Sequence, residues 1–176
     1  MIYKSDTAEK DALLEVARLM VTAARTAPKA RGIDTILTMI IDGSEKDAVA
    51  NEMRRIHGGD EGRAFFKRDA NCVDASECVV VLAVIDKHVG LDICDACGME
   101  NCGAAKKAGL PCCFNISDLG TAACSACAVA SHHWVDNRLM YTIGKAVQNL
   151  GLFETDIRMC YGIPISATGK SIYYDR

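Results

Sequence analysis

Cysteine is the residue type whose number and spacing could do chemistry in this chain. Seven of the ten cysteines lie between positions 94 and 127: Cys94, Cys97, Cys102, Cys112, Cys113, Cys124 and Cys127. Iron–sulfur clusters are held by cysteine thiolates, three from one short loop and a fourth from a nearby segment. The run Cys94-x2-Cys97-x4-Cys102 followed by Cys112 fits this requirement, although it matches neither the bacterial nor the plant ferredoxin spacing. The segment therefore predicts a metal centre.

Two other chemistries use the same residues. Zinc prefers two Cys-x2-Cys pairs, and Cys94/Cys97 with Cys124/Cys127 is formally such a set, although the second pair falls in a predicted helix. Either pair also has the spacing of a redox dithiol, but no helix N-terminus that would lower a thiol pKa precedes Cys94. The scattered cysteines are expected to be buried core thiols, which behave as small hydrophobic residues: Cys72, Cys78 and Cys160.

The composition excludes several classes of protein. The 176 residues include 20 Lys+Arg and 23 Asp+Glu, a formal charge of −3, and half are hydrophobic. This near-neutral balance argues against binding to nucleic acid or to an anionic membrane, and the apolar runs are too short to cross a bilayer. The polar N-terminal sequence predicts a cytoplasmic protein, in which thiols stay reduced. The length suits one domain, residues 1–176, with a cysteine-rich loop at 90–114 inside it.

The first half of the chain alternates helical and strand patterns. Apolar residues at helical spacing follow Asp6, which is expected to cap a helix, until Pro28 stops the pattern. A strand is expected at 35–41, a second helix at 44–57 and a short helix near 63–68. The run Cys78–Ile85 is almost continuously apolar and predicts a central strand buried on both faces. A local group of cations is expected to be a solvated face that could dock an acidic redox partner: Arg54, Arg55, Arg63, Lys67 and Arg68.

The second half of the chain begins with the segment 86–114, which is rich in Gly, Asp and Cys and has no periodicity. A helix of small residues is expected from about 117 to 132, another from the Asp136 cap to Leu150, and a last strand at 157–165. This order predicts an α+β fold with three layers, in which helices cover a small sheet and the metal loop is inserted between a strand and a helix.

Longer motifs carry a resemblance to a known family. They include the stretch from Gly90 through Cys94, Cys97 and Cys102, the tripeptide Asp118-Leu119-Gly120, and the segments 135–140 and 161–170. Together they resemble the prokaryotic ferredoxin domain-containing proteins, over essentially the whole chain. The resemblance implies a [4Fe–4S] cluster on Cys94, Cys97, Cys102 and a cysteine just before Phe114. Cys112 is the expected fourth ligand, with the adjacent Cys113 as the alternative.

The frame of the chain resembles a short nitroreductase fold. The residues that carry this likeness are 23–30, the Asp118-Leu119-Gly120 helix and 161–164. The resemblance implies a homodimer with FMN at the subunit interface, and a helix of small residues permits close approach of a second copy. The cations nearest to an expected flavin phosphate are Arg25, Lys29 and Arg31. The chain lacks the arginine-rich start of nitroreductases, and Gly32-Ile33-Asp34 replaces their Asn/Gln-Pro-Trp stretch.

Two functions from different classes follow from these patterns. The first is an iron–sulfur protein with a redox or electron-transfer role, including a flavin-assisted oxidoreductase. The second is non-catalytic: a [4Fe–4S] cluster or a zinc ion staples the loop of a sensor or assembly protein. The metal centre is expected at one end of the sheet, beside the N-terminus of the helix at 117, and any pocket there should include Asn115, Ser117 and Asp118.

Overall fold

A computed structural model describes residues 1–91 and 93–174. Asp92, Asp175 and Arg176 lie outside the described residues. Asp92 belongs to the Gly90–Cys94 motif, so this part of the motif is not described. The elements in chain order are α1 (Ser5–Thr26), η1 (Ala30–Gly32), β1 (Ile36–Asp42), α2 (Gly43–His57), η2 (Glu61–Arg63), α3 (Ala64–Asp74), β2 (Cys78–Ile85), α4 (Cys102–Lys107), α5 (Cys113–His132), β3 (Asp136–Asn137), α6 (Tyr141–Leu150) and β4 (Ile157–Ser166).

The sheet has the order β1-β2-β4-β3, and all of its pairings are antiparallel. Strand β2 lies in the interior of this order, with Val80 opposite Ile40 on β1 and Ile163 on β4. Every β2 residue from Cys78 to Val84 is buried. The prediction of a central strand buried on both faces is therefore confirmed.

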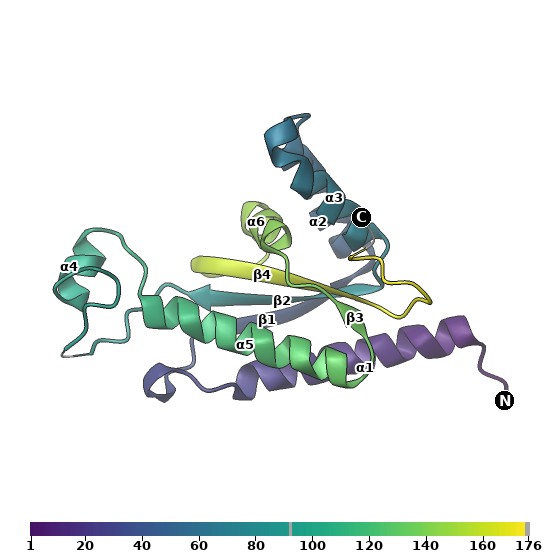
Figure 1. The fold of residues 1–176 in the computed structure, drawn as a ribbon, viewed down its shortest axis with the longest axis horizontal. Coiled ribbons are helices and arrows are strands. Elements are labelled where there is room, and N and C mark those ends of the chain that lie inside the picture. Colours follow the sequence, from purple (N-terminus) through teal and green to yellow (C-terminus); the bar gives the residue numbers. More distant parts are fainter. Residues whose placement is uncertain (92, 175–176) are drawn as a thin grey trace.

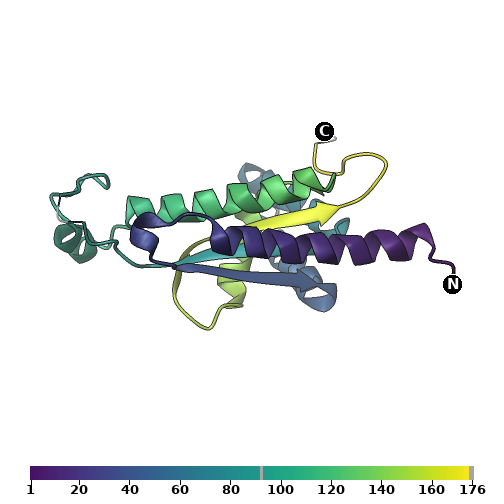
Figure 2. The same ribbon diagram turned by 90° about the horizontal axis from the view of Figure 1, so that it is seen from below.

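Helices cover both faces of the sheet (Figures 1 and 2). Helices α1 and α5 lie side by side on one face, and α2, α3 and α6 lie on the other. Alternate β2 residues point to opposite faces, as the period of a strand requires: Val80 and Leu82 join the core under α1 and α5, whereas Val79 and Val81 join the core under α2 and α6. The expected α+β fold with a small sheet between helical layers is confirmed.

Helix α6 packs closely on strand β4 through two glycines, one on each element. A Cβ atom added at Gly144 would overlap the backbone carbonyl of Cys160, and one added at Gly162 would overlap the side chain of Ile143. Both positions therefore require glycine because the helix and the strand approach so closely. This contact holds α6 against the middle of β4.

Several expected boundaries are wrong. Helix α5 begins at Cys113 rather than near 117, and the loop contains a short helix, α4, that lacks an apolar period. Helix α6 begins at Tyr141 rather than after Asp136, because Asp136 and Asn137 pair with β4 as strand β3. The helix expected near 63–68 is α3, which continues to Asp74.

Among the described residues, α5 alone is long and apolar enough to span a membrane by length and composition, with a mean hydropathy of 1.2 over its most apolar stretch. Its small apolar residues have another explanation in the fold. Leu119, Ala122, Ala123 and Ala126 are fully buried against α1 and the sheet. These buried residues make one side of the helix part of the core between α1 and the sheet.

Candidate metal centre

The cysteine loop leaves the sheet where β2 ends at Ile85 and returns at Cys112, just before α5. It projects beyond the N-terminal end of α5, at one end of the sheet (Figure 1). The expected position of the loop beside the N-terminus of this helix is therefore confirmed, with the helix starting at Cys113 instead of 117. No side chain caps this terminus, so its first amide groups remain directed toward the loop.

Tight turns shape the loop. The N–H of Gly98 donates to the carbonyl of Asp95 at 2.7 Å, which closes a turn that carries Cys97. Gly98 has a φ of 79°, in the left-handed region that favours glycine. The Asn101 side chain then accepts from the N–H of Ala104 at 2.9 Å and caps α4, whose first residue is Cys102. The turn and the cap thus set the directions of the second and third cysteines.

The thiols of the loop differ in exposure. Cys94, Cys97 and Cys102 are each half-buried, so they lie at the surface of the protein. Cys113 is exposed, and its Sγ donates to the carbonyl of Ala96 at 3.2 Å. Cys112, the expected fourth ligand, is only 6% exposed and occupies the N-cap position of α5.

Two arginines hold the two ends of the loop. The Arg31 guanidinium donates from Nη1 to the carbonyls of Val89 at 3.3 Å and Gly90 at 3.0 Å, four to five residues before the first loop cysteine. Arg158 on β4 donates to the carbonyl of Gly109 at 3.0 Å, a few residues before Cys112. The structure therefore ties the base of the loop to the frame at both ends.

No group of three or more His, Cys, Asp and Glu side chains within residues 1–91 and 93–174 is arranged to hold a single metal ion. The zinc set of Cys94, Cys97, Cys124 and Cys127 is not brought together. Cys124 lies eleven residues beyond Cys113 along α5, roughly 16 Å at the rise of an α-helix. The loop extends beyond the N-terminus of α5, in the direction away from Cys124 and the rest of the helix. A cluster differs from an ion because each thiolate binds a different iron, so its ligands stand further apart.

The other cysteines are poor candidates for ligands. Burial raises the pKa of Cys78 and of Cys160 to about 12, and that of Cys127 to about 11, with the nearby Cys124 adding to the last shift. Burial likewise raises the pKa of Cys72. A metal ligand must be a thiolate. The expectation that Cys72, Cys78 and Cys160 are buried core thiols is confirmed.

The cations expected near a flavin phosphate are engaged within the chain. Arg25 pairs with Asp34 at 2.5 Å and donates to the carbonyl of Ile36 at 2.6 Å. Although desolvation acts the other way, these Arg25 and backbone hydrogen bonds hold the pKa of Asp34 below its usual value. The Lys29 ammonium is nearly buried and donates to the last carbonyls of α1, and Arg31 binds the cysteine loop. Arg25 still lines an open groove of about 580 Å³ beside β1.

The residues expected to line a pocket at the start of α5 are instead packed or exposed. Asn115 is 2% exposed and donates to the Thr35 hydroxyl at 2.8 Å, and Asp118 accepts from the N–H of Ala30 at 3.0 Å. Ser117 lies at the surface. Both polar side chains therefore dock α5 onto the segment before β1.

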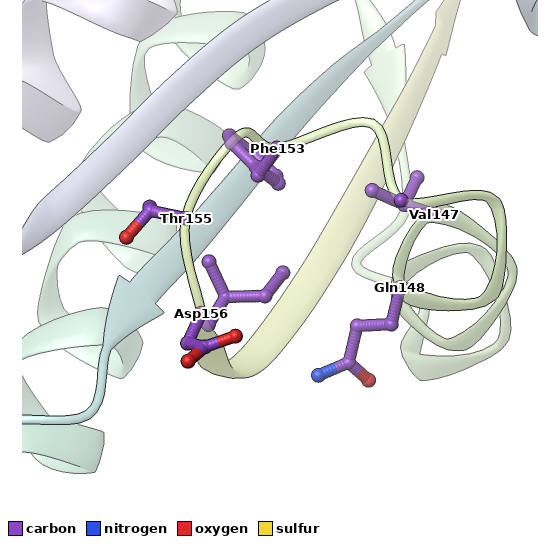
Figure 3. Close-up of a pocket in the computed structure, with 7 residues that line it drawn as sticks. Val147, Gln148, Phe153, Thr155 and Asp156 are labelled. Carbon is purple, nitrogen blue, oxygen red and sulfur yellow. The ribbon is translucent and has the colours of Figure 1, made fainter.

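A pocket of about 230 Å³ does open at this end of the sheet, but on the opposite face (Figure 3). It lies between the end of α6 and the start of β4 and is lined by Val147, Gln148, Gly151, Phe153, Thr155, Asp156 and Ile157. The sequence did not predict this pocket, because its lining residues form no local motif. It did not predict the role of Arg158 for the same reason. The only local signal is Gly151, which ends α6 in a left-handed conformation.

The frame around this loop is that of the nitroreductases. A nitroreductase with bound FMN from Desulfitobacterium hafniense superimposes with a TM-score of 0.61 at 13% identity, over 89% of this chain and 79% of that one. A nitroreductase family protein from Clostridium novyi gives a TM-score of 0.59 at 11% identity, over 98% of this chain and 80% of that one. At these identities the likeness defines the fold.

Sequence similarity defines the family within that fold. A protein of Archaeoglobus fulgidus, described as an "Uncharacterized protein", is 41% identical over 170 residues, which cover 91% of this chain and 89% of that protein. Residues 108–176 match the family described as "Uncharacterized protein containing a ferredoxin domain (DUF2148)". This chain belongs to that family, which confirms the expected resemblance to the ferredoxin domain-containing proteins.

Proposed function

We propose that this chain is a cytoplasmic iron–sulfur protein with an electron-transfer role. It binds a [4Fe–4S] cluster through Cys94, Cys97 and Cys102, with a fourth thiolate from the adjacent pair Cys112 and Cys113. The observation that carries the proposal is the set of half-buried thiols in a glycine-turned loop against the uncapped end of α5. The family's ferredoxin domain supports it.

The loop residues fit such a group. A cluster bound there supplies one-electron redox chemistry, and its potential depends on hydrogen bonds to the sulfurs and on exposure to solvent. The chain contributes thiolates at the surface, where a redox partner can approach, rather than in the core. The first amide groups of α5, those of Cys113, Phe114 and Asn115, lack helical partners because the first intrahelical bond runs from Ile116 to Cys112.

The end of α5 also favours negative charge near the loop. The peptide dipoles of this 20-residue helix leave partial positive charge at its N-terminus. A thiolate-ligated cluster carries net negative charge, so the helix end stabilises the bound form. Nearby, Arg31 adds a cation at the base of the loop. Both charges act in the same direction, toward retention of an anionic group and toward its reduced state.

The homodimer expected from sequence remains part of this proposal. The outward side of α5 carries small, exposed residues, including Cys124, Ala128 and Ser131, on which a second copy could pack closely. A stable dimer interface would bury more than about 2,000 Å² in total. Light scattering at micromolar concentration tests this state, and a monomeric mass would contradict it.

FMN is not assigned to a site in this proposal. The fold is shared with a nitroreductase that binds FMN, yet all three of the expected phosphate cations, Arg25, Lys29 and Arg31, already donate to backbone carbonyls. Of the three, Arg25 also lines an open groove, so it is the candidate for contact with a flavin phosphate. Absorbance near 450 nm in purified protein, compared with an Arg25→Ala variant, tests whether flavin binds there.

The experiment for the proposed function is a redox titration of anaerobically purified protein. A cluster that takes up and releases one electron reversibly supports electron transfer. A cluster that is present but not reducible down to the potential of dithionite would contradict that role and favour the alternative, a loop stapled by its cluster in a sensor or assembly protein.

A further inference from the structure

We propose that Cys113, and not Cys112, is the fourth ligand of the cluster. This assignment rests on the proposed function, since it needs a cluster on the loop. The two residues are neighbours at the start of α5, but Cys112 is the N-cap with an extended backbone (φ −75°, ψ 124°), whereas Cys113 is the first helical residue. One of them therefore faces the loop while the other turns toward the protein interior.

Cys113 is the residue whose thiol already reaches the loop. Its Sγ lies 3.2 Å from the carbonyl oxygen of Ala96, the residue between Cys94 and Cys97. That carbonyl belongs to the turn closed by the bond from the Gly98 N–H to Asp95. The thiol of Cys113 is thus placed at the turn that carries Cys97 and directly follows Cys94, from a position 17 residues away in sequence from Ala96.

The exposure of the thiols gives a second, independent argument. Cys94, Cys97 and Cys102 are half-buried, so a cluster bound to them lies at the protein surface. Cys113 is exposed on that surface, whereas Cys112 is 6% exposed. A buried side chain at the N-cap would have to turn outward, with a change in the helix start, before it could reach such a cluster.

For Cys113 to bind the cluster, the hydrogen bond from its thiol to Ala96 must be replaced by a bond from its thiolate to iron. The S–H that donates to the Ala96 carbonyl loses its proton to solvent, and the resulting thiolate binds one iron. The Ala96 carbonyl is then free to accept from water, because it lies in an exposed turn. Cys112 keeps its backbone role, in which its carbonyl accepts from the Ile116 N–H at 3.1 Å.

The test compares Cys113→Ala with Cys112→Ala, both purified without oxygen beside the wild-type chain. We expect Cys113→Ala to fall from about four irons per chain to three or fewer and to show the signal of a [3Fe–4S] cluster in electron paramagnetic resonance. We expect Cys112→Ala to keep the full iron content. As a conservative variant, Cys113→Ser should retain iron with a shifted midpoint potential.

Several results would overturn the assignment. A Cys113→Ala chain with wild-type iron content contradicts it, whether or not Cys112→Ala is depleted. If both variants lose iron, Cys112→Val, which refills the buried space, decides: retention of the cluster attributes the loss to packing and supports Cys113, whereas loss contradicts it. A wild-type chain that binds zinc and no iron refutes the proposed function itself, and is therefore distinguishable from a wrong choice of ligand.

Discussion

The cysteines of the sheet and the cysteines of the loop carry the same side chain in opposite environments. Cys78 on β2 and Cys160 on β4 lie in neighbouring strands, fully enclosed, and burial raises the pKa of both to about 12. Cys94, Cys97 and Cys102 are half-buried in a loop outside the sheet. Packing in the core, and not the residue type, therefore holds the thiols of Cys78 and Cys160 in their neutral form.

The largest difference between the two regions should be seen in iron content. Cys97→Ala removes a proposed ligand, so we expect the chain to lose most of its approximately four irons. Cys160→Ala removes a buried thiol, so this variant should keep all of its irons. Its free energy of unfolding should fall by about 1 kcal/mol because packing is lost. Iron and sulfide assays on both anaerobic variants check this. Equal iron content in the two variants would remove the basis of the comparison.

Glycine substitutions should separate the same regions by stability. A Cβ at Gly144 would overlap the Cys160 carbonyl, so Gly144→Ala should lower the free energy of unfolding by about 3 kcal/mol or more. Gly98→Ala meets no atom within 4 Å and suffers only its positive φ, a cost of about 1 kcal/mol. Urea unfolding of both variants gives these free energies. If Gly98→Ala were as unstable as Gly144→Ala, the loop would not be independent of the core as expected.

The buried thiols predict a loss of stability in alkali. Burial raises the pKa of both thiols from 9.0 to about 12 in the folded chain. Their contribution to the free energy of unfolding is therefore complete below pH 9 and is lost as the pH rises toward 12. At pH 10 each thiol should lower the free energy of unfolding by about 1.4 kcal/mol. Thermal or urea unfolding at pH 8 and pH 10 measures the decrease, and the double variant Cys78→Ala/Cys160→Ala should show a smaller one. An identical decrease in that variant would argue against these groups as the cause.

The smallest expected effect concerns the clamp at the base of the loop. Arg31 has a φ of 56°, so Arg31→Gly relieves about 1 kcal/mol of backbone strain while removing two hydrogen bonds worth about 1 kcal/mol each. Global stability should change by no more than about 1 kcal/mol, whereas loss of iron to a chelator should accelerate about fivefold. Arg31→Lys is the matched control that keeps the charge. An unchanged rate of iron loss in Arg31→Gly would show that this arginine does not hold the loop.

The parts of the fold that sequence predicted well are those governed by local pattern. The apolar run of β2 gave its bounds, Cys78–Ile85, and its central place, and Gly151 marked the end of α6. Residues 136–137 were misassigned because their pairing with β4, which lies about 30 residues away in sequence, overrides the apparent cap at Asp136. A tertiary contact therefore accounts for this error.

The candidate site divides in the same way. Spacing alone was enough to propose Cys94, Cys97 and Cys102 as ligands, because a loop that wraps a cluster is local in sequence. Spacing could not predict that Arg31 would bind Val89 and Gly90 instead of remaining free, since that contact spans 58 to 59 positions. The exposure of Cys113 depends on where α5 begins, and this too is a property of the folded chain.

Metal analysis of wild-type protein purified without oxygen tests the central claim most directly. Iron, acid-labile sulfide and zinc are measured on the same sample and divided by chain concentration. The proposed function predicts about four irons and four sulfides per chain, with no stoichiometric zinc. One zinc per chain without iron or sulfide would contradict it.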